Sequence, residues 1–242
     1  MKDLSIPKLL LLTFIPALGI VASFIFFTFL LREVIPPFLC NLFGIVLVMV
    51  PFQMGVILYT SKKEYGKYSL KSALTYTQKI SKKHFIGSTL FSIAWVTIIF
   101  LVLGNIEHEF MFKTLFVFVP DYFKLGDFPN QISLYHINIL KVTCVLLLVL
   151  NGLLAPIVEE LYFRGFLLPR LSRFGKYSPL IITILFSFYH LFSPWENITR
   201  IIAMFPYNYL VWKHKNIYIG ILTHCFMNLI SGALIFVLIF ST

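Results

Sequence analysis

The chain has 242 residues, of which 59% are hydrophobic and 12% are charged, and its formal net charge is +10. Soluble domains carry about 25% charged residues, so a soluble globule of this size could not bury so much apolar surface. Intrinsic disorder is excluded because it requires low hydrophobicity, and a disulfide-rich secreted domain is excluded because the chain has three cysteines. The solvent that fits this composition is a lipid bilayer.

Apolar runs long enough to cross a membrane recur along the chain. A hydrocarbon core of about 30 Å requires roughly 20 apolar residues in a helix. We expect seven spans, at residues 9–31, 38–59, 85–103, 137–155 and beyond, 179–192, 198–212 and 217–240. An eighth is expected if residues 110–123 enter the membrane. The predicted fold class is therefore all-α, a polytopic integral membrane helical bundle in which residues 1–242 form a single domain.

Basic residues cluster in alternate loops of this arrangement. Seven lysines lie between the second and third spans, and the two later loops on the same side are also basic. Because cytoplasmic loops are enriched in lysine and arginine, we expect a cytoplasmic N-terminus and an external C-terminus, in the plasma membrane of a prokaryote. The basic face is expected to contact anionic lipid headgroups. Nucleic acid is not an expected partner.

Two further expectations concern the membrane surface. Residues 65–84 mix lysines with Leu70 and Leu74, a pattern typical of an amphipathic helix that lies on the bilayer. Trp195 and Trp212 stand near the ends of spans, where tryptophan usually anchors a helix at the interface.

Ionisable side chains inside the spans are concentrated in the last 90 residues. Because a charged group in the membrane is costly, such residues are functional candidates by default. Three segments carry them: the fourth span with its continuation, the fifth span and the seventh span. The candidates are Glu159, Glu160 and Arg164 in the first segment, His190 with Phe186 in the second, and His224 with Asn228 in the third.

Helical spacing separates the roles of the two acids. Glu160 and Arg164 are four residues apart, so they share a helix face and can form an ion pair. Glu159 points about 100° away and is the carboxylate that this arginine is less able to neutralise. A desolvated carboxylate of this kind can act as a general base. At 1.5 Å per residue from the expected cytoplasmic turns, Glu159, His190 and His224 all lie roughly 10–20 Å deep.

The three groups of polar residues match, in order, three motifs of one family. The sequence has E-E-x-x-x-R at 159–164, F-x-x-x-H at 186–190 and H-x-x-x-N at 224–228. Residues 140–235 therefore resemble the motif-bearing core of the CPBP family, which comprises CAAX proteases and bacteriocin-processing or self-immunity (Abi) proteins. The N-terminal 130 residues carry no motif that matches this family.

The resemblance implies a glutamate-dependent intramembrane endopeptidase that uses neither a metal nor another cofactor. It implies that Glu159 and His190 activate a water molecule and that His224 and Asn228 stabilise the oxyanion. Glu160 with Arg164 would hold the geometry of the first motif. The expected substrate is a hydrophobic, prenylated or otherwise membrane-associated peptide.

Other functions remain open at this stage. Two glutamates and two histidines could instead bind zinc as in a metalloprotease, although the H-E-x-x-H signature is absent. The chain could also be a non-catalytic immunity or signalling protein that binds a peptide in the membrane. A transporter is disfavoured, because the sequence has no inverted repeat and its polar residues lie in one half.

Overall fold

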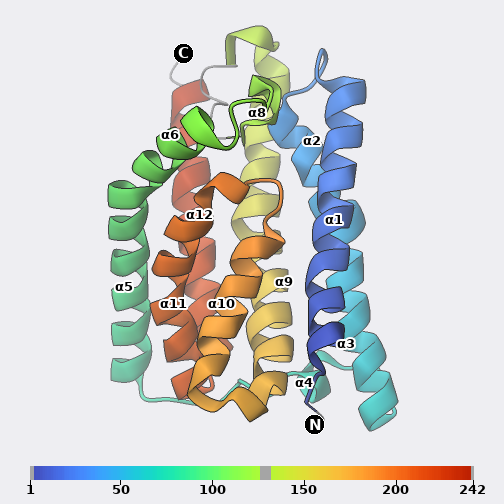
Figure 1. The fold of residues 1–242 in the computed structure, drawn as a ribbon, viewed down its shortest axis with the longest axis vertical. Coiled ribbons are helices and arrows are strands. Elements are labelled where there is room, and N and C mark those ends of the chain that lie inside the picture. Colours follow the sequence, from blue (N-terminus) through green and yellow to red (C-terminus); the bar gives the residue numbers. More distant parts are fainter. Residues whose placement is uncertain (1–2, 126–131, 241–242) are drawn as a thin grey trace.

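The computed structural model describes residues 3–125 and 132–240, and it consists of long helices packed side by side (Figure 1). None of the described residues forms a strand; a single antiparallel bridge joins Thr77 to Asn216. The all-α bundle expected from the sequence is thus confirmed.

The first half of the chain forms three long helical units, and the second and third of them continue through a short π-helical segment. The units are α1 (Ile6–Leu31); α2 (Pro37–Gly44) with a π-helical segment (Ile45–Met49) and α3 (Val50–Tyr65); and α5 (Lys82–Ile99) with a π-helical segment (Phe100–Gly104) and α6 (Asn105–Thr114). Ser5 caps α1 and Ser81 caps α5, each by accepting a hydrogen bond from a backbone amide of the first turn. Gly66, with φ of +75°, ends α3.

The second half contains one long helix that reverses into a hairpin, followed by two more helices. In order these are α8 (Ile137–Leu146), a π-helical segment (Leu147–Leu154), α9 (Ala155–Glu159), a second π-helical segment (Glu160–Leu167), 3₁₀ turns (Leu168–Tyr177), α10 (Ser178–Tyr189), α11 (Asn197–His214) and α12 (Ile217–Phe240). The reversal takes place at Gly175, whose φ is +52°. Glycine adopts this conformation without a steric penalty.

Among the residues that the structure describes, five helical stretches are long and apolar enough to cross a membrane. They are Ile6–Leu31, Pro37–Tyr65, Lys82–Thr114, Ile137–Tyr189 and Ile217–Phe240. The fourth contains the reversal at Gly175 and therefore includes both α8–α9 and α10. The expected count of seven spans is not confirmed. Residues 110–123 hold the end of α6 and a 3₁₀ turn (Asp121–Phe123), so they form no long helix of their own.

The basic loops gather at one end of the bundle, the lower end in Figure 1. Arg170 beside the hairpin pairs with Glu64 at the end of α3 (3.2 Å), and the backbone amide of Leu4 donates to the carbonyl of Arg170. The turn between α11 and α12 joins the same layer through the Thr77–Asn216 bridge. The grouping agrees with the loop pattern of the sequence; the cytoplasmic assignment of this end stays a prediction.

The prediction of a surface helix over residues 65–84 is wrong. Between the end of α3 at Tyr65 and the start of α5 at Lys82, only α4 (Leu70–Ala73) is helical, and the chain that follows α4 is not helical. The amide of Gln78 donates to the carbonyl of Lys215 (3.0 Å), and the amide of Ile217 donates to the carbonyl of Tyr76 (2.8 Å). Pairing with this distant turn satisfies the backbone without a helix, and Leu74 is buried rather than exposed to lipid headgroups.

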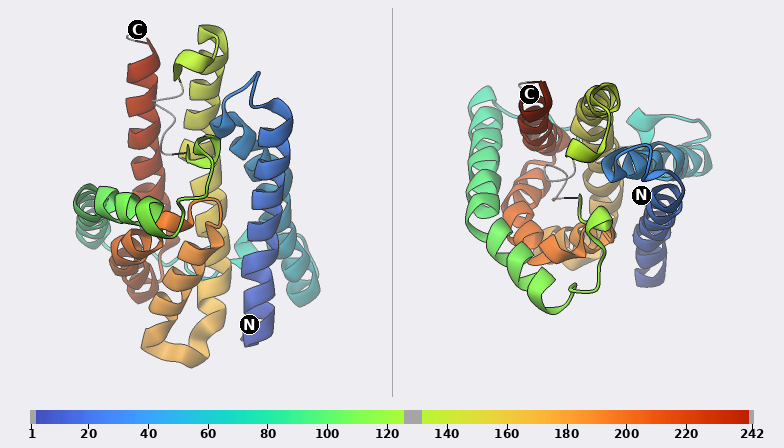
Figure 2. Two further views of the ribbon diagram at one scale, coloured as in Figure 1. Left: turned by 45° about the horizontal axis from the view of Figure 1, so that its top comes forward. Right: turned by 90° about the horizontal axis from the view of Figure 1, so that it is seen from above.

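Helices α10 (12 residues) and α11 (18 residues) are shorter than α1 (26 residues) and α12 (24 residues). Figure 1 shows the connection between them well below the upper ends of α1 and α12, with α6 crossing nearby; Figure 2 shows α6 bent away from the axis of α5. Trp195 lies in this connection, 4% exposed, with Phe112 and Phe116 against its ring. Its expected role as an interfacial anchor is therefore wrong, because α6 covers it.

Candidate active site

The ion pair expected in the first motif is present and fully buried. Arg164 Nη1 lies 3.1 Å from Glu160 Oε1, and neither side chain is exposed. Additional hydrogen bonds to the two partners help to stabilise a buried ion pair. Glu160 Oε1 also accepts a hydrogen bond from the Tyr207 hydroxyl (3.0 Å) and lies 3.0 Å from His224 Nδ1. Glu160 is therefore the point at which α11 and α12 meet the helix of the first motif.

The Arg164 guanidinium is held from its other side by α10 and α11. Its Nε donates to Asn208 Oδ1 (2.7 Å), and Asn208 Nδ2 in turn donates to Thr183 Oγ1 (2.7 Å). Its Cζ lies 4.0 Å from the centre of the Phe186 ring, an arrangement that stabilises a cation through the negative face of the ring. The phenylalanine of the second motif thus contacts the arginine of the first.

Both imidazoles are oriented through their Nδ1 atoms. His190 Nδ1 lies 2.8 Å from the Phe186 carbonyl oxygen, and His224 Nδ1 lies 3.0 Å from the Glu160 carboxylate. Since a carbonyl or a carboxylate oxygen accepts, each Nδ1 is the donor. The neutral tautomer of each ring therefore carries its lone pair on Nε2.

The two Nε2 atoms face the same carboxylate, that of Glu159. His190 Nε2 is 3.9 Å from Oε1 and His224 Nε2 is 3.9 Å from Oε2, while Glu159 is only 6% exposed. These separations are too long for direct hydrogen bonds. Each of them fits a water molecule that contacts the carboxylate and one imidazole. The structure thus brings together Glu159, His190 and His224, as the depth estimate from the sequence predicts.

Asn228 lies one turn beyond His224 on α12 but does not contact Glu159. Its Nδ2 donates to the backbone carbonyl of Asn151 (2.9 Å), which belongs to the π-helical segment Leu147–Leu154. Nδ2 carries two hydrogens, so one remains for another acceptor. Asn228 and His224 both line a cavity of about 200 Å³.

This cavity is bounded by α5 with its π-helical continuation, α11 and α12. Its apolar walls are formed by Val96, Phe100, Met204 and Met227. Ligand sites are usually lined by many apolar side chains and a few polar groups. The cavity therefore approaches the cluster of Glu159, His190 and His224 from the side of His224, because His224 lines it and His190 does not.

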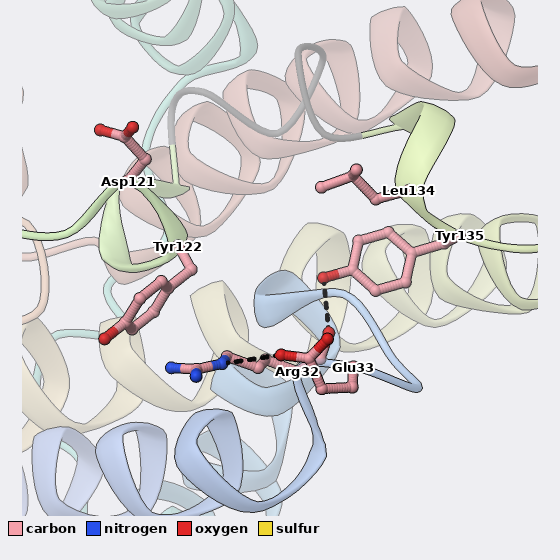
Figure 3. Close-up of a pocket in the computed structure, with 6 residues that line it drawn as sticks. All are labelled: Arg32, Glu33, Asp121, Tyr122, Leu134 and Tyr135. Carbon is pink, nitrogen blue, oxygen red and sulfur yellow. Dashed lines mark hydrogen bonds and ion pairs between the residues drawn. The ribbon is translucent and has the colours of Figure 1, made fainter.

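A larger cavity, of about 350 Å³, lies at the end of α1 far from these residues (Figure 3). Arg32 pairs there with Glu33 (3.1 Å) and stacks on Tyr122, and the Tyr135 hydroxyl donates to the Arg32 carbonyl (2.8 Å). None of the site residues predicted from the sequence lines it.

Sequence reasoning missed Tyr207 and Asn208, which complete the network around Glu160 and Arg164. Both lie within the expected sixth span and are buried. An amide inside an apolar run is the same signal that marked Asn228, but no motif partner stands near it in the sequence. Tyr207 stands out less, because a tyrosine in an apolar span is not an unusual residue.

A comparison with known families matches the part of the chain that carries the three motifs. Residues 141–230 match a family model described as type II CAAX prenyl endopeptidase, Rce1-like. The matched segment contains all three motifs, and the match confirms the family resemblance seen in the sequence. Comparisons with curated proteins and with solved structures gave no match.

Proposed function

We propose that this protein is an intramembrane endopeptidase that cleaves a hydrophobic or lipidated peptide with a water molecule activated by Glu159 and His190. The observation that carries the proposal is the position of the buried Glu159 carboxylate, which faces two imidazole Nε2 atoms at 3.9 Å each. The match of residues 141–230 to CAAX-type membrane proteases supports the same activity.

In the proposed reaction, the water lies between Glu159 and His190 Nε2. Glu159 accepts a proton from this water as the oxygen attacks the scissile carbonyl carbon, and a tetrahedral oxyanion forms. The proton then passes from Glu159 to the departing amine nitrogen as the C–N bond breaks, which returns the carboxylate to its starting state. General-base help of this kind contributes about 10²–10⁴-fold in rate.

The hydrogen-bond donors for the oxyanion would come from α12. Asn228 Nδ2 keeps one hydrogen free of its bond to Asn151. His224 already donates from Nδ1 to Glu160, so it donates from Nε2 only as the imidazolium. The assignment of His224 therefore requires a proton on both ring nitrogens when the oxyanion forms. Glu160, held by Arg164 and Tyr207, is the group that orients this ring.

The proposal is tested with purified protein in detergent micelles and a quenched fluorescent peptide that ends in a farnesylated CAAX sequence. Glu159→Gln removes the base, and His190→Gln removes the imidazole that contacts the water; both keep approximate size and hydrogen-bonding ability. Each is expected to lower kcat by at least about 10²-fold. The control is Glu109→Gln, an exposed acid on α6 that pairs with Lys113, which is expected to cleave as the wild type does.

Each alternative predicts a different outcome, either in this cleavage assay or in cells that express the variant. Cleavage that is lost with a chelator and restored by zinc would favour a metalloprotease. A Glu159→Gln variant that folds, inserts and keeps the full cellular phenotype would favour a peptide-binding immunity or signalling protein. Wild-type cleavage that persists in Glu159→Gln would contradict the proposed mechanism.

A further inference from the structure

The chain directly after His190 is irregular, and Ser193 and Trp195 within it are buried. Helix α10 has 12 residues and is therefore about 18 Å long, shorter than a bilayer core. It ends at Tyr189, and His190, with φ of −80° and ψ of 56°, turns the chain away from the helix axis. Irregular backbone at membrane depth is tolerated only where protein groups satisfy its amides and carbonyls.

Arg200, in the first turns of α11, supplies donors to this segment. Its side chain is buried, and its two terminal nitrogens contact residues on both sides of His190. Nη1 donates to the Ser187 carbonyl (3.4 Å) and to Asn197 Oδ1 (3.2 Å). Nη2 donates to Ser193 Oγ (2.8 Å) and to the Ser193 carbonyl (3.5 Å), and it pairs with Glu196 (2.9 Å).

The groups that Arg200 contacts are the ones that fix the backbone of His190. The amide of His190 donates to the Ser187 carbonyl (3.1 Å), and the amide of Ser193 donates to the His190 carbonyl (2.9 Å). Ser187 and Ser193 are both contacted by the guanidinium, so the residue between them is held from both sides. A lysine has a single side-chain nitrogen instead of the planar guanidinium, so it cannot bind Ser187 and Ser193 through two separate nitrogens as Arg200 does.

The start of α11 is itself fixed by a distant acid. Glu107, a buried residue of α6, accepts hydrogen bonds from the amides of Ile198 (2.8 Å) and Thr199 (2.6 Å). A carboxylate at a helix N-terminus satisfies amides that have no partner within the helix and interacts favourably with the helix dipole. The turn that carries Arg200 therefore has little freedom to move.

We propose that Arg200 is a positioning residue: by binding both ends of the loop that begins at His190, it fixes the imidazole opposite Glu159. This inference rests on the proposed function for its catalytic consequence, but the geometry it describes can be measured without turnover.

Arg170 provides a matched control because it is also a buried arginine that binds backbone carbonyls and one acid. It donates to the carbonyls of Phe166 (3.0 Å) and Ala73 (3.5 Å) and pairs with Glu64. It lies beside the hairpin at the opposite end of α10 from His190. A purely structural role of Arg200 would make Arg200→Met and Arg170→Met alike in kinetics.

The experiment compares the wild type, Arg200→Met, Arg200→Lys and Arg170→Met in detergent micelles. Amide hydrogen exchange is followed by mass spectrometry, and kcat and KM are measured with the farnesylated CAAX peptide. For Arg200→Met we expect faster exchange confined to residues 187–196 and a kcat lowered by about 10²-fold with KM unchanged, the cost of a displacement near 1 Å. Arg200→Lys is expected to lie between this variant and the wild type. Arg170→Met is expected to speed exchange near the hairpin and to keep the wild-type kcat in the folded fraction.

Two results would overturn the inference. Unchanged exchange of residues 187–196 in Arg200→Met would show that Arg200 does not hold the loop, whether or not the wild type cleaves. Faster exchange with a wild-type kcat would show that the loop does not position the imidazole. A wild-type protein that cleaves no peptide counts against the proposed function instead, and the exchange data then decide the inference alone.

Discussion

Gly220 on α12 stands against the carboxylate of Glu160, so that a Cβ atom at position 220 would overlap Glu160 Oε2 and lie 3.1 Å from Cδ. The position is one turn before His224, on the same face of the helix. The absence of a side chain at position 220 is therefore what allows α12 to approach the helix of the first motif closely enough for His224 to reach Glu160.

Gly220→Ala is expected to displace the Glu160 carboxylate or to separate the two helices. Overpacking of this kind costs about 1–3 kcal/mol in stability, and a shift near 1 Å at the site lowers kcat by about 10²-fold. Thermal unfolding and peptide cleavage measure the two effects separately. Gly87→Ala is the control, because a Cβ atom on that helical glycine meets nothing within 4 Å; equal kinetics for the two variants would contradict the argument.

Tyr207→Phe removes the hydroxyl that donates to Glu160 (3.0 Å) and leaves the ring in place. A hydrogen bond to a charged group contributes about 1.5–3 kcal/mol, so we expect a loss of stability of this order and a lower kcat, because Glu160 orients His224. Unfolding midpoints and kcat are the measurements. Tyr209→Phe, an exposed position on the same helix, should change neither; a Tyr207→Phe variant that matches it would remove Tyr207 from the network.

The local part of this network could be predicted from the sequence, because spacing alone determines it. A spacing of four positions places Glu160 and Arg164 on one helix face, and residue counts from the turns bring Glu159, His190 and His224 to one depth. The reversal at Gly175 also lies between the expected fourth and fifth spans.

The long-range part could not be predicted, because no local pattern encodes it. Tyr207 is 47 residues from Glu160, and the pairing of Gln78 with Lys215 joins segments that are farther apart. For residues 65–84 the amphipathic pattern was present, but extended pairing with the α11–α12 turn prevailed over helix formation. The contacts that hold α10 and α11 are of the same kind. Arg200 binds Ser187, and Glu107 binds the amide of Ile198 more than 90 residues further along the chain, so only the folded structure reveals them.

Phe186→Leu tests the contact between the second motif and the first. The Phe186 ring lies 4.0 Å from Arg164 Cζ, and leucine keeps the apolar contact but lacks the negative ring face. A buried cation–π contact is worth about 2 kcal/mol, so Phe186→Leu is expected to lower stability by roughly this amount, whereas Phe186→Trp would keep the interaction at the risk of overpacking. The cleanest comparison is the double variant with Arg164→Met: if the cost of Phe186→Leu is unchanged when the arginine is absent, the ring contributes by packing alone.

The 200 Å³ cavity beside His224 and Asn228 predicts a preference for substrate side chains of limited size. Phe100 forms part of its wall from the π-helical continuation of α5, and Phe100→Ala enlarges it. One or two methylene groups in an apolar pocket are worth about 1–3 kcal/mol in discrimination, so this variant should shift cleavage toward peptides with a larger apolar residue next to the scissile bond by about tenfold or more. The measurement is kcat/KM for a peptide series that differs at that residue. Phe91→Ala on the same helix removes an exposed ring outside the cavity and should leave the series unchanged; if Phe100→Ala also leaves it unchanged, the cavity does not receive the substrate side chain.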